Sequence, residues 1–447
     1  MRRDDLQATT PRGGIGAPQR ALRFLTAGSV DDGKSTLIGR LLYDSRAILA
    51  DQLDHLHRRG AGAPRAEGDP GFDLSLLTDG LEAEREQGIT IDVAYRYFAT
   101  PRRKFIIADA PGHEQYTRNM VTAAAGSDAA VVLVDITKLD TKAAPLRLLP
   151  QTRRHALLAH LLRVPSIVFA VNKLDAIDDP RPAFEAVREA LLGFAKEAGI
   201  EVAEVIPVSA LRGDNVAEPL AAAWYGGPSL LQVLERLPAA EERKDASLRI
   251  PVQYVARDSA DGEGTGHQPR TLWGRIAHGR VRAGDAVQIF PSGERATVAE
   301  VRVAGSAVPL AEAGRSAGLV LDRQLDVSRG DWIVTPEQTR ATRRFAATLA
   351  WLDTEPAQVG RKYWLRHGNR WLQARIASIE SRLDIDTLEA TEAHALAVND
   401  IGHVIVETQA PLPLEPYASN RIGGALIVVD AASHRTSGAL LVKELLT

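Results

Sequence analysis

A glycine-rich segment near the N-terminus has the residue types and spacing that bind a polyphosphate. The pattern G-x-x-x-x-G-K-[ST] runs from Gly28 to Ser35. Backbone N–H groups of such a loop face phosphate oxygens at the start of a helix, where the helix dipole favours negative charge. The pattern predicts that Lys34 contacts the β- and γ-phosphates and that the Ser35 hydroxyl binds Mg²⁺. The predicted phosphate loop comprises Gly28, Ser29, Val30, Asp31, Asp32, Gly33, Lys34, Ser35 and Thr36.

The run Asp109-Ala110-Pro111-Gly112-His113 carries groups that suit the hydrolysis of a bound phosphate. Asp109 ends a buried strand pattern, where a carboxylate faces the ligand crevice, and it is predicted to hold Mg²⁺ through water. The Gly112 N–H is expected to contact the γ-phosphate. His113 would then stand near the attacking water and orient it, although a polar residue that simply begins a helix has the same appearance.

A threonine at the start of a strand pattern completes the predicted phosphate end of the site. Apolar and polar residues alternate from Ile89 to Tyr97, and Thr90 lies at the mouth of this strand. Its hydroxyl is expected to bind Mg²⁺ and its N–H to meet the γ-phosphate, which would order the preceding loop in one nucleotide state. Taken alone, the residue fits an ordinary edge-strand threonine better. The predicted catalytic residues are Lys34, Thr90 and His113, and the predicted Mg²⁺ ligands are Ser35, Thr90 and Asp109.

The motif Asn172-Lys173-Leu174-Asp175 predicts recognition of a guanine base. The guanine edge offers N1–H and N2–H₂ donors side by side, and the Asp175 carboxylate can accept both, whereas adenine offers no such pair. The apolar stem of Lys173 is expected to cover the base plane. One strand–helix unit later, backbone N–H groups are expected to meet guanine O6 in the run Ser209, Ala210 and Leu211.

These motifs need elements that bring them to one edge of a sheet. Residues 21–240 alternate strand and helix patterns, which predicts a mostly parallel sheet with helices on both faces. The order of the motifs is that of an α/β P-loop GTPase domain, with GTP and Mg²⁺ as its ligands. Beyond it, short strands with Gly, Pro and Asp turns predict two all-β barrels. We place the barrels at residues 248–338 and 343–447, and a disordered tail at 1–20.

Composition narrows the class of protein. A chain of 447 residues is too long for one core, so several domains are expected. With 54 basic against 57 acidic residues there is no basic excess, which disfavours a nucleic-acid partner. The absence of cysteine excludes disulfides and thiolate metal sites and suits a reducing cytoplasm. The apolar runs are too short to span a bilayer and the N-terminus lacks a signal-peptide core, so we expect a cytoplasmic protein without a membrane partner.

The order of motifs, followed by two barrels, resembles the translational GTPases of the elongation factor Tu type. The resemblance is closer to the CysN family, the GTPase large subunits (subunit 1) of the bacterial two-subunit sulfate adenylyltransferase, and covers about residues 21–445. The phosphate loop has Ser29, Asp32 and Ser35 where translation factors typically show His, His and Thr. Other stretches similar to the family are residues 72–98, 224–230, 399–402 and 417–425.

The resemblance implies a division of labour between two subunits. A small catalytic subunit (CysD-like) makes adenylyl sulfate and diphosphate from ATP and sulfate, and GTP hydrolysis by the large subunit drives that reaction. The two are expected to form a heterodimer or a higher assembly of heterodimers. The segment of residues 139–150 is longer than the family's usual turn at this place. Residues 257–270 also depart from the family's pattern. We therefore expect the interface with the partner subunit to differ from that of the family.

Two other functions remain open at this level. One alternative is an elongation factor Tu-like translational GTPase that binds aminoacyl-tRNA, which the near-neutral charge and the variant phosphate loop disfavour. The other is a regulatory GTPase with a different partner.

Overall fold

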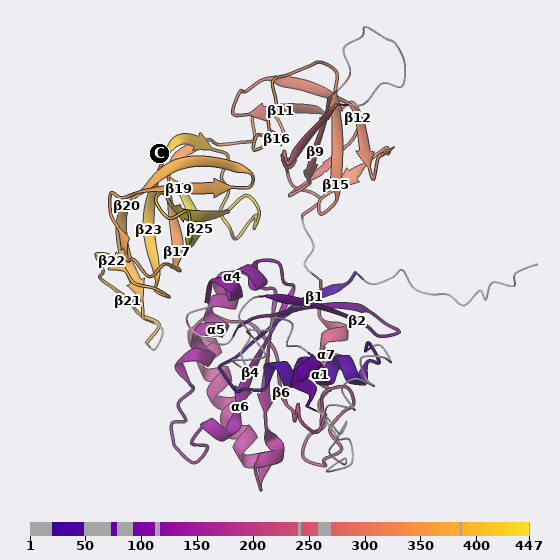
Figure 1. Cartoon of the computed structure of the whole chain (residues 1–447), viewed down its shortest axis with the longest axis vertical. Coiled ribbons are helices and arrows are strands. Elements are labelled where there is room, and N and C mark those ends of the chain that lie inside the picture. Colours follow the sequence, from indigo (N-terminus) through magenta and orange to yellow (C-terminus); the bar gives the residue numbers. More distant parts are fainter. Residues whose placement is uncertain are drawn as a thin grey trace, which may run out of the picture.

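The computed structural model describes residues 20–48, 73–77, 93–111, 117–239, 243–257, 270–384 and 387–446. In these ranges the chain forms an α/β domain followed by two β domains (Figure 1). This arrangement confirms the predicted fold class. Three predicted site residues, Thr90, Gly112 and His113, lie outside the described residues, as does most of the predicted tail.

The sheet of the α/β domain has the strand order β2-β3-β1-β4-β5-β6. Only the β2–β3 pair among these is antiparallel, and the pairs from β3 through β1, β4 and β5 to β6 are parallel. Every residue of β4 and β5 is buried, as expected for strands that are covered on both faces. The strands are β1 (Leu22–Ala27), β2 (Ala94–Ala99), β3 (Lys104–Asp109), β4 (Ala129–Asp135), β5 (Ser166–Asn172) and β6 (Val202–Pro207).

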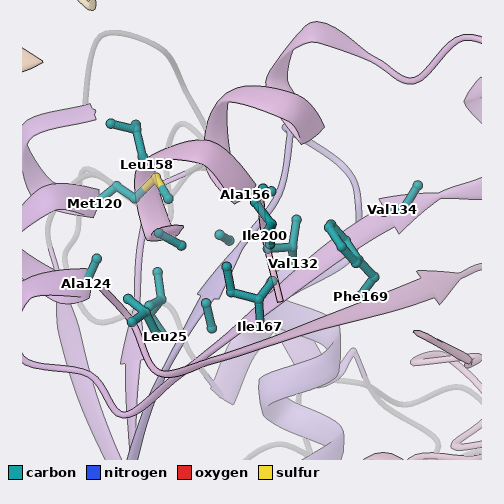
Figure 2. Packing of buried hydrophobic residues seen from close by; sticks show 14 of the residues in the cluster. Leu25, Met120, Ala124, Val132, Val134, Ala156, Leu158, Ile167, Phe169 and Ile200 are labelled. Carbon is teal, nitrogen blue, oxygen red and sulfur yellow. The ribbon is translucent and has the colours of Figure 1, made fainter. Parts of the chain in front are cut away.

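Helices cover both faces of this sheet and bury two separate cores. On one face, Met120, Leu158 and Ile167 pack with Leu25 and Phe169 (Figure 2). On the other face, α1 and α7 pack with the opposite side chains of the same strands. The helices are α1 (Lys34–Asp44), α4 (Thr117–Ala125), α5 (Pro150–Leu161), α6 (Pro180–Glu197) and α7 (Leu230–Arg236), with short 3₁₀ turns η1 (Leu74–Leu77), η3 (Ile136–Lys138) and η4 (Leu174–Ala176).

The first β domain wraps an antiparallel sheet around one apolar core. Its strand order is β7-β16-β11-β12-β15-β9-β8, with β13 paired to β12 and a separate β10–β14 pair. The strands are β7 (Arg249–Pro251), β8 (Tyr254–Arg257), β9 (Arg270–Arg275), β10 (Arg280–Val281), β11 (Ala286–Phe290), β12 (Arg295–Val303), β13 (Ser306–Ala307), β14 (Ala311–Glu312), β15 (Ser316–Leu321) and β16 (Trp332–Val334).

The second β domain is a closed barrel. Its strand order is β19-β24-β25-β17-β23-β20-β21, and the additional pairing of β19 with β20 closes the ring. The strands are β17 (Thr342–Trp351), β18 (Ala357–Gln358), β19 (Lys362–His367), β20 (Arg370–Leu383), β21 (Ala390–Thr391), β22 (Ala395–Leu396), β23 (Ile401–Leu412), β24 (Ala425–Asp430) and β25 (Thr436–Leu446).

Specific contacts join the closed barrel to its neighbours. The Tyr417 hydroxyl donates to the Leu162 carbonyl at the end of α5, at 2.8 Å. Arg421 donates to the Ala125 carbonyl at the end of α4, at 3.0 Å. Between the two β domains, the His367 ring stacks on Trp332 with the ring centroids 4.9 Å apart. Within the part of the chain that is described, no helix combines the length and apolar character needed to cross a membrane.

Candidate nucleotide site

The predicted phosphate loop connects the C-terminal end of β1 to the first turn of α1. Gly33 lies just before the helix in the left-handed region, with φ of 91°. A Cβ atom at this position would collide with the side-chain amide nitrogen of Asn172, so both the backbone angle and the space require glycine. The N–H groups of the first helical turn, which have no acceptor within the helix, therefore lie directly next to the loop. There they can donate to the oxygens of a bound phosphate.

Lys34 is folded back over the loop that precedes it. Its side chain is buried, and Nζ donates to the Gly28 carbonyl at 2.9 Å and to the Ser29 carbonyl at 2.6 Å. Burial lowers the pKa of Lys34, while the carboxylates of Asp32 and Asp109 oppose this by raising it. An ammonium held this way is ready to exchange carbonyl oxygens for the more strongly charged oxygens of a phosphate.

Asp109 ends β3 beside the phosphate loop, where the sequence places it. The carboxylate is buried and accepts a hydrogen bond from the Thr26 hydroxyl at 3.3 Å, and these two residues are direct partners in the β1–β3 ladder. Ser35 lies in the first turn of the adjoining α1. A carboxylate and a hydroxyl are the hard oxygen donors that Mg²⁺ prefers, and Mg²⁺ in such sites takes few protein ligands because phosphates and waters supply the rest. The donor set therefore fits Mg²⁺.

Asn172 joins the phosphate loop to the loop that follows β6. At the end of β5 its Nδ2 donates to the Asp32 carbonyl at 2.8 Å, and its Oδ1 accepts from the Ala210 N–H at 2.9 Å. Both functional atoms of this buried amide thus bind backbone groups of the protein. This side chain therefore fixes the phosphate end and the predicted guanine end of the site to each other.

Part of the predicted guanine-recognition set lines an open space. Asp175 lies half-buried in η4, and it lines a cavity of about 290 Å³ together with Ser209. Leu211 is 64% exposed, so its side chain is available as an apolar surface for a base. The N–H of Ser209 donates to Asp214 and that of Ala210 to Asn172, so among the described residues Leu211 is the member of this run whose N–H has no acceptor.

Sequence reasoning missed two cations that support these loops. Arg40, buried on α1, donates to the carbonyls of Ala210 and Leu211 at 3.4 and 2.5 Å. Lys138 donates to the Asp32 carboxylate and to the Val30 carbonyl. An arginine on an otherwise apolar helix face was the available signal for Arg40, since such a group is buried only with partners.

Comparison with known proteins gives a consistent result. The family model for the elongation factor Tu GTP-binding domain matches residues 19–239, and the GTP-eEF1A C-terminal domain-like model matches residues 344–443. A protein named sulfate adenylyltransferase subunit 1 from Laribacter hongkongensis is 43% identical over 426 residues, covering 95% of this chain and 85% of the relative. Its counterpart of the same name from Salmonella typhimurium is 43% identical, over 95% of this chain and 86% of the relative. The bifunctional enzyme NodQ from Azospirillum brasilense is 45% identical, over 96% of this chain and 67% of the relative.

Proposed function

Because the chain belongs to the family of sulfate adenylyltransferase subunit 1, we propose that it hydrolyses GTP to drive the synthesis of adenylyl sulfate and diphosphate from ATP and sulfate. It is the GTPase component of that enzyme, and the word "subunit" in the relatives' names implies a partner chain. The partner we propose is a small catalytic subunit of the CysD type, in a heterodimer or an assembly of heterodimers. We assign the activity to the cytoplasm, where GTP, ATP and sulfate meet.

The observation that carries the proposal is the position of Asn172. Its two hydrogen bonds hold the phosphate loop against the loop containing Ala210, so one ligand can reach both ends of the site. A guanine nucleotide has the matching chemistry, with a base edge for the Asp175 carboxylate and phosphates for Lys34. The exposed side chain of Leu211 would pack against one face of the base and the stem of Lys173 against the other.

Hydrolysis in this site depends mainly on charge stabilisation. The transferred phosphoryl group passes through a loose transition state, in which Lys34 and the loop N–H groups stabilise charge on the oxygens. Mg²⁺, held by Ser35, Asp109 and Thr90, would neutralise charge on the β- and γ-phosphates. We propose that the Gly112 N–H contacts the γ-phosphate and that His113 orients the attacking water.

The decisive experiment measures GTP hydrolysis by this chain alone and with the candidate small subunit, each with and without ATP and sulfate. The proposal predicts stimulation that requires the partner together with both substrates, accompanied by adenylyl sulfate. If the rate of GTP hydrolysis is unchanged by the small subunit, ATP and sulfate but rises with ribosomes and aminoacyl-tRNA, the protein is a translational GTPase instead.

A further inference from the structure

Four charged side chains of alternating sign connect the phosphate loop to Lys173 of the Asn172–Asp175 motif. Lys138, the last residue of η3, donates to Asp32 Oδ1 at 2.9 Å and to the Val30 carbonyl at 2.5 Å. Its ammonium also lies 3.9 Å from Asp135 Oδ2, and the same oxygen is 2.7 Å from Lys173 Nζ. The charges therefore follow the order Asp32, Lys138, Asp135, Lys173.

The Asp32 carboxylate needs a cation because of where it lies. Its side chain is fully buried inside a loop that must accept a polyphosphate, and its Oδ2 accepts the Ser29 N–H at 2.5 Å. This hydrogen bond fixes the turn of the loop, but an uncompensated buried anion would destabilise the loop and repel the phosphates. Among the described residues, Lys138 is the cation within ion-pair distance of this carboxylate.

The other half of the network fixes the position of Lys173. Asp135 is buried at the end of β4, and its Oδ1 accepts from the N–H and the hydroxyl of Thr137 at 2.9 and 2.6 Å. Burial alone would raise the pKa of Asp135, but hydrogen bonds from Lys173 and Thr137 outweigh it and lower that pKa, so the carboxylate stays charged. Asp135 thus fixes the Lys173 ammonium, and in the proposed function the apolar stem of Lys173 would be left to cover the base.

We propose that Lys138 is a positioning residue for GTP, which neutralises Asp32 to hold the phosphate loop in its binding conformation and, through Asp135, connects this loop to Lys173. The inference rests on the proposed function, because it assumes that GTP occupies this site. Lys138 acts through Asp32 and needs no contact with the nucleotide. The competing explanation is that the Lys138 ammonium binds phosphate directly.

A double-mutant cycle separates the two explanations. GTP and GDP dissociation constants are measured by titration calorimetry for the wild type, Lys138→Met, Asp32→Asn and the double variant. In Lys138→Met the buried carboxylate loses its cation, so we expect affinity for GTP to fall at least about tenfold. In Asp32→Asn the amide still accepts the Ser29 N–H and carries no charge, so a loss of no more than about threefold is expected, and the double variant should stay close to it.

The outcomes are distinct. Recovery of affinity in the double variant supports the proposal, whereas a double variant as weak as Lys138→Met shows a direct phosphate contact and overturns it. Unchanged affinity in Lys138→Met also overturns it.

Lys142→Met is the matched control for general loss of charge, because Lys142 is exposed and lies on the segment that joins η3 to α5. If Lys138→Met does not fold, judged by thermal melting without nucleotide, Lys138→Arg must restore both folding and affinity. Failure of the wild type to bind GTP would refute the proposed function and, with it, the role of Lys138 in GTP binding, whereas normal wild-type binding with unchanged affinity in Lys138→Met would overturn the role of Lys138 alone.

Discussion

Replacing Gly33 with alanine tests whether the phosphate loop and the loop after β6, which contains Ala210, are held as one unit. At this position the backbone has φ of 91°, and the added methyl group would occupy the space of the Asn172 side-chain amide. The substitution must therefore strain the backbone, displace Asn172 or do both. Displacement of Asn172 reaches the loop after β6, because Asn172 Oδ1 is the acceptor for the Ala210 N–H.

The size of the effect follows from the contacts. A non-glycine residue in the left-handed region costs about 1–2 kcal/mol. Displacing Asn172 removes two hydrogen bonds, worth about 1 kcal/mol each, and leaves the buried Ala210 N–H without an acceptor, which costs a further ~1 kcal/mol or more. If the substitution destabilises the loop conformation that binds GTP by about 3 kcal/mol of this total, the dissociation constant for GTP rises by more than about 100-fold.

The assay is a fluorescence titration with a labelled GTP analogue, combined with urea unfolding of the same samples. Gly199→Ala is the matched control, since Gly199 also has a positive φ, of 67°, but its added Cβ would meet no atom within 4 Å. The control should lose about 1 kcal/mol of unfolding free energy and keep its affinity for GTP. Wild-type affinity in Gly33→Ala, or an equal loss in both variants, would refute the reasoning.

Two further predictions concern base recognition and pH. Asp175→Asn replaces an acceptor with a donor opposite the guanine N1–H, so preference should shift from GTP towards XTP in a competition titration, and an unchanged preference would contradict the role of Asp175. Burial holds the pKa of His367 at about 4, below the ordinary 6.5, so the unfolded chain takes up the proton first as pH falls. Stability should therefore decline from pH 6.5 towards pH 4 by up to about 3 kcal/mol from this group, and His367→Phe, which keeps a ring against Trp332, should flatten the slope measured by urea unfolding at several pH values.

The motifs and the α/β architecture were predictable because local signals specify them. The spacing of Gly28, Gly33, Lys34 and Ser35 predicts the phosphate loop. Mostly apolar runs such as those of β4 and β5 indicate strands that are buried on both faces. The motif Asn172–Asp175 likewise predicts the base contact, but nothing in the spacing shows that both Asn172 amide atoms are used within the protein. That assignment depends on how closely two loops approach in space. The roles of Thr90 and His113 stay predictions, since both residues lie outside the described ranges.

Charge networks and barrel closure were less predictable because they depend on long-range pairing. Lys138 follows β4 as an ordinary surface lysine would, and only the fold brings it to Asp32, 106 residues earlier in the chain. Apolar and polar residues alternate along the strands of the closed barrel, which makes the strands recognisable in the sequence. This alternation does not show that β19 pairs with both β20 and β24. The predicted domain boundaries follow changes in composition, and they stay predictions.

The closed barrel also constrains the order in which the chain acquires structure during synthesis. Its first strand, β17, lies between β23 and β25, so one neighbour of this strand is made about ninety residues after it. The Thr342 hydroxyl even donates to the carbonyl of Leu446, at 2.8 Å. A nascent chain therefore carries β17 with one unpaired edge until β25 has left the ribosome. The described strands of the α/β domain end at Pro207, so none of them depends on the C-terminal part of the chain for a neighbour. This domain can therefore fold before the last strand of the barrel has been synthesised.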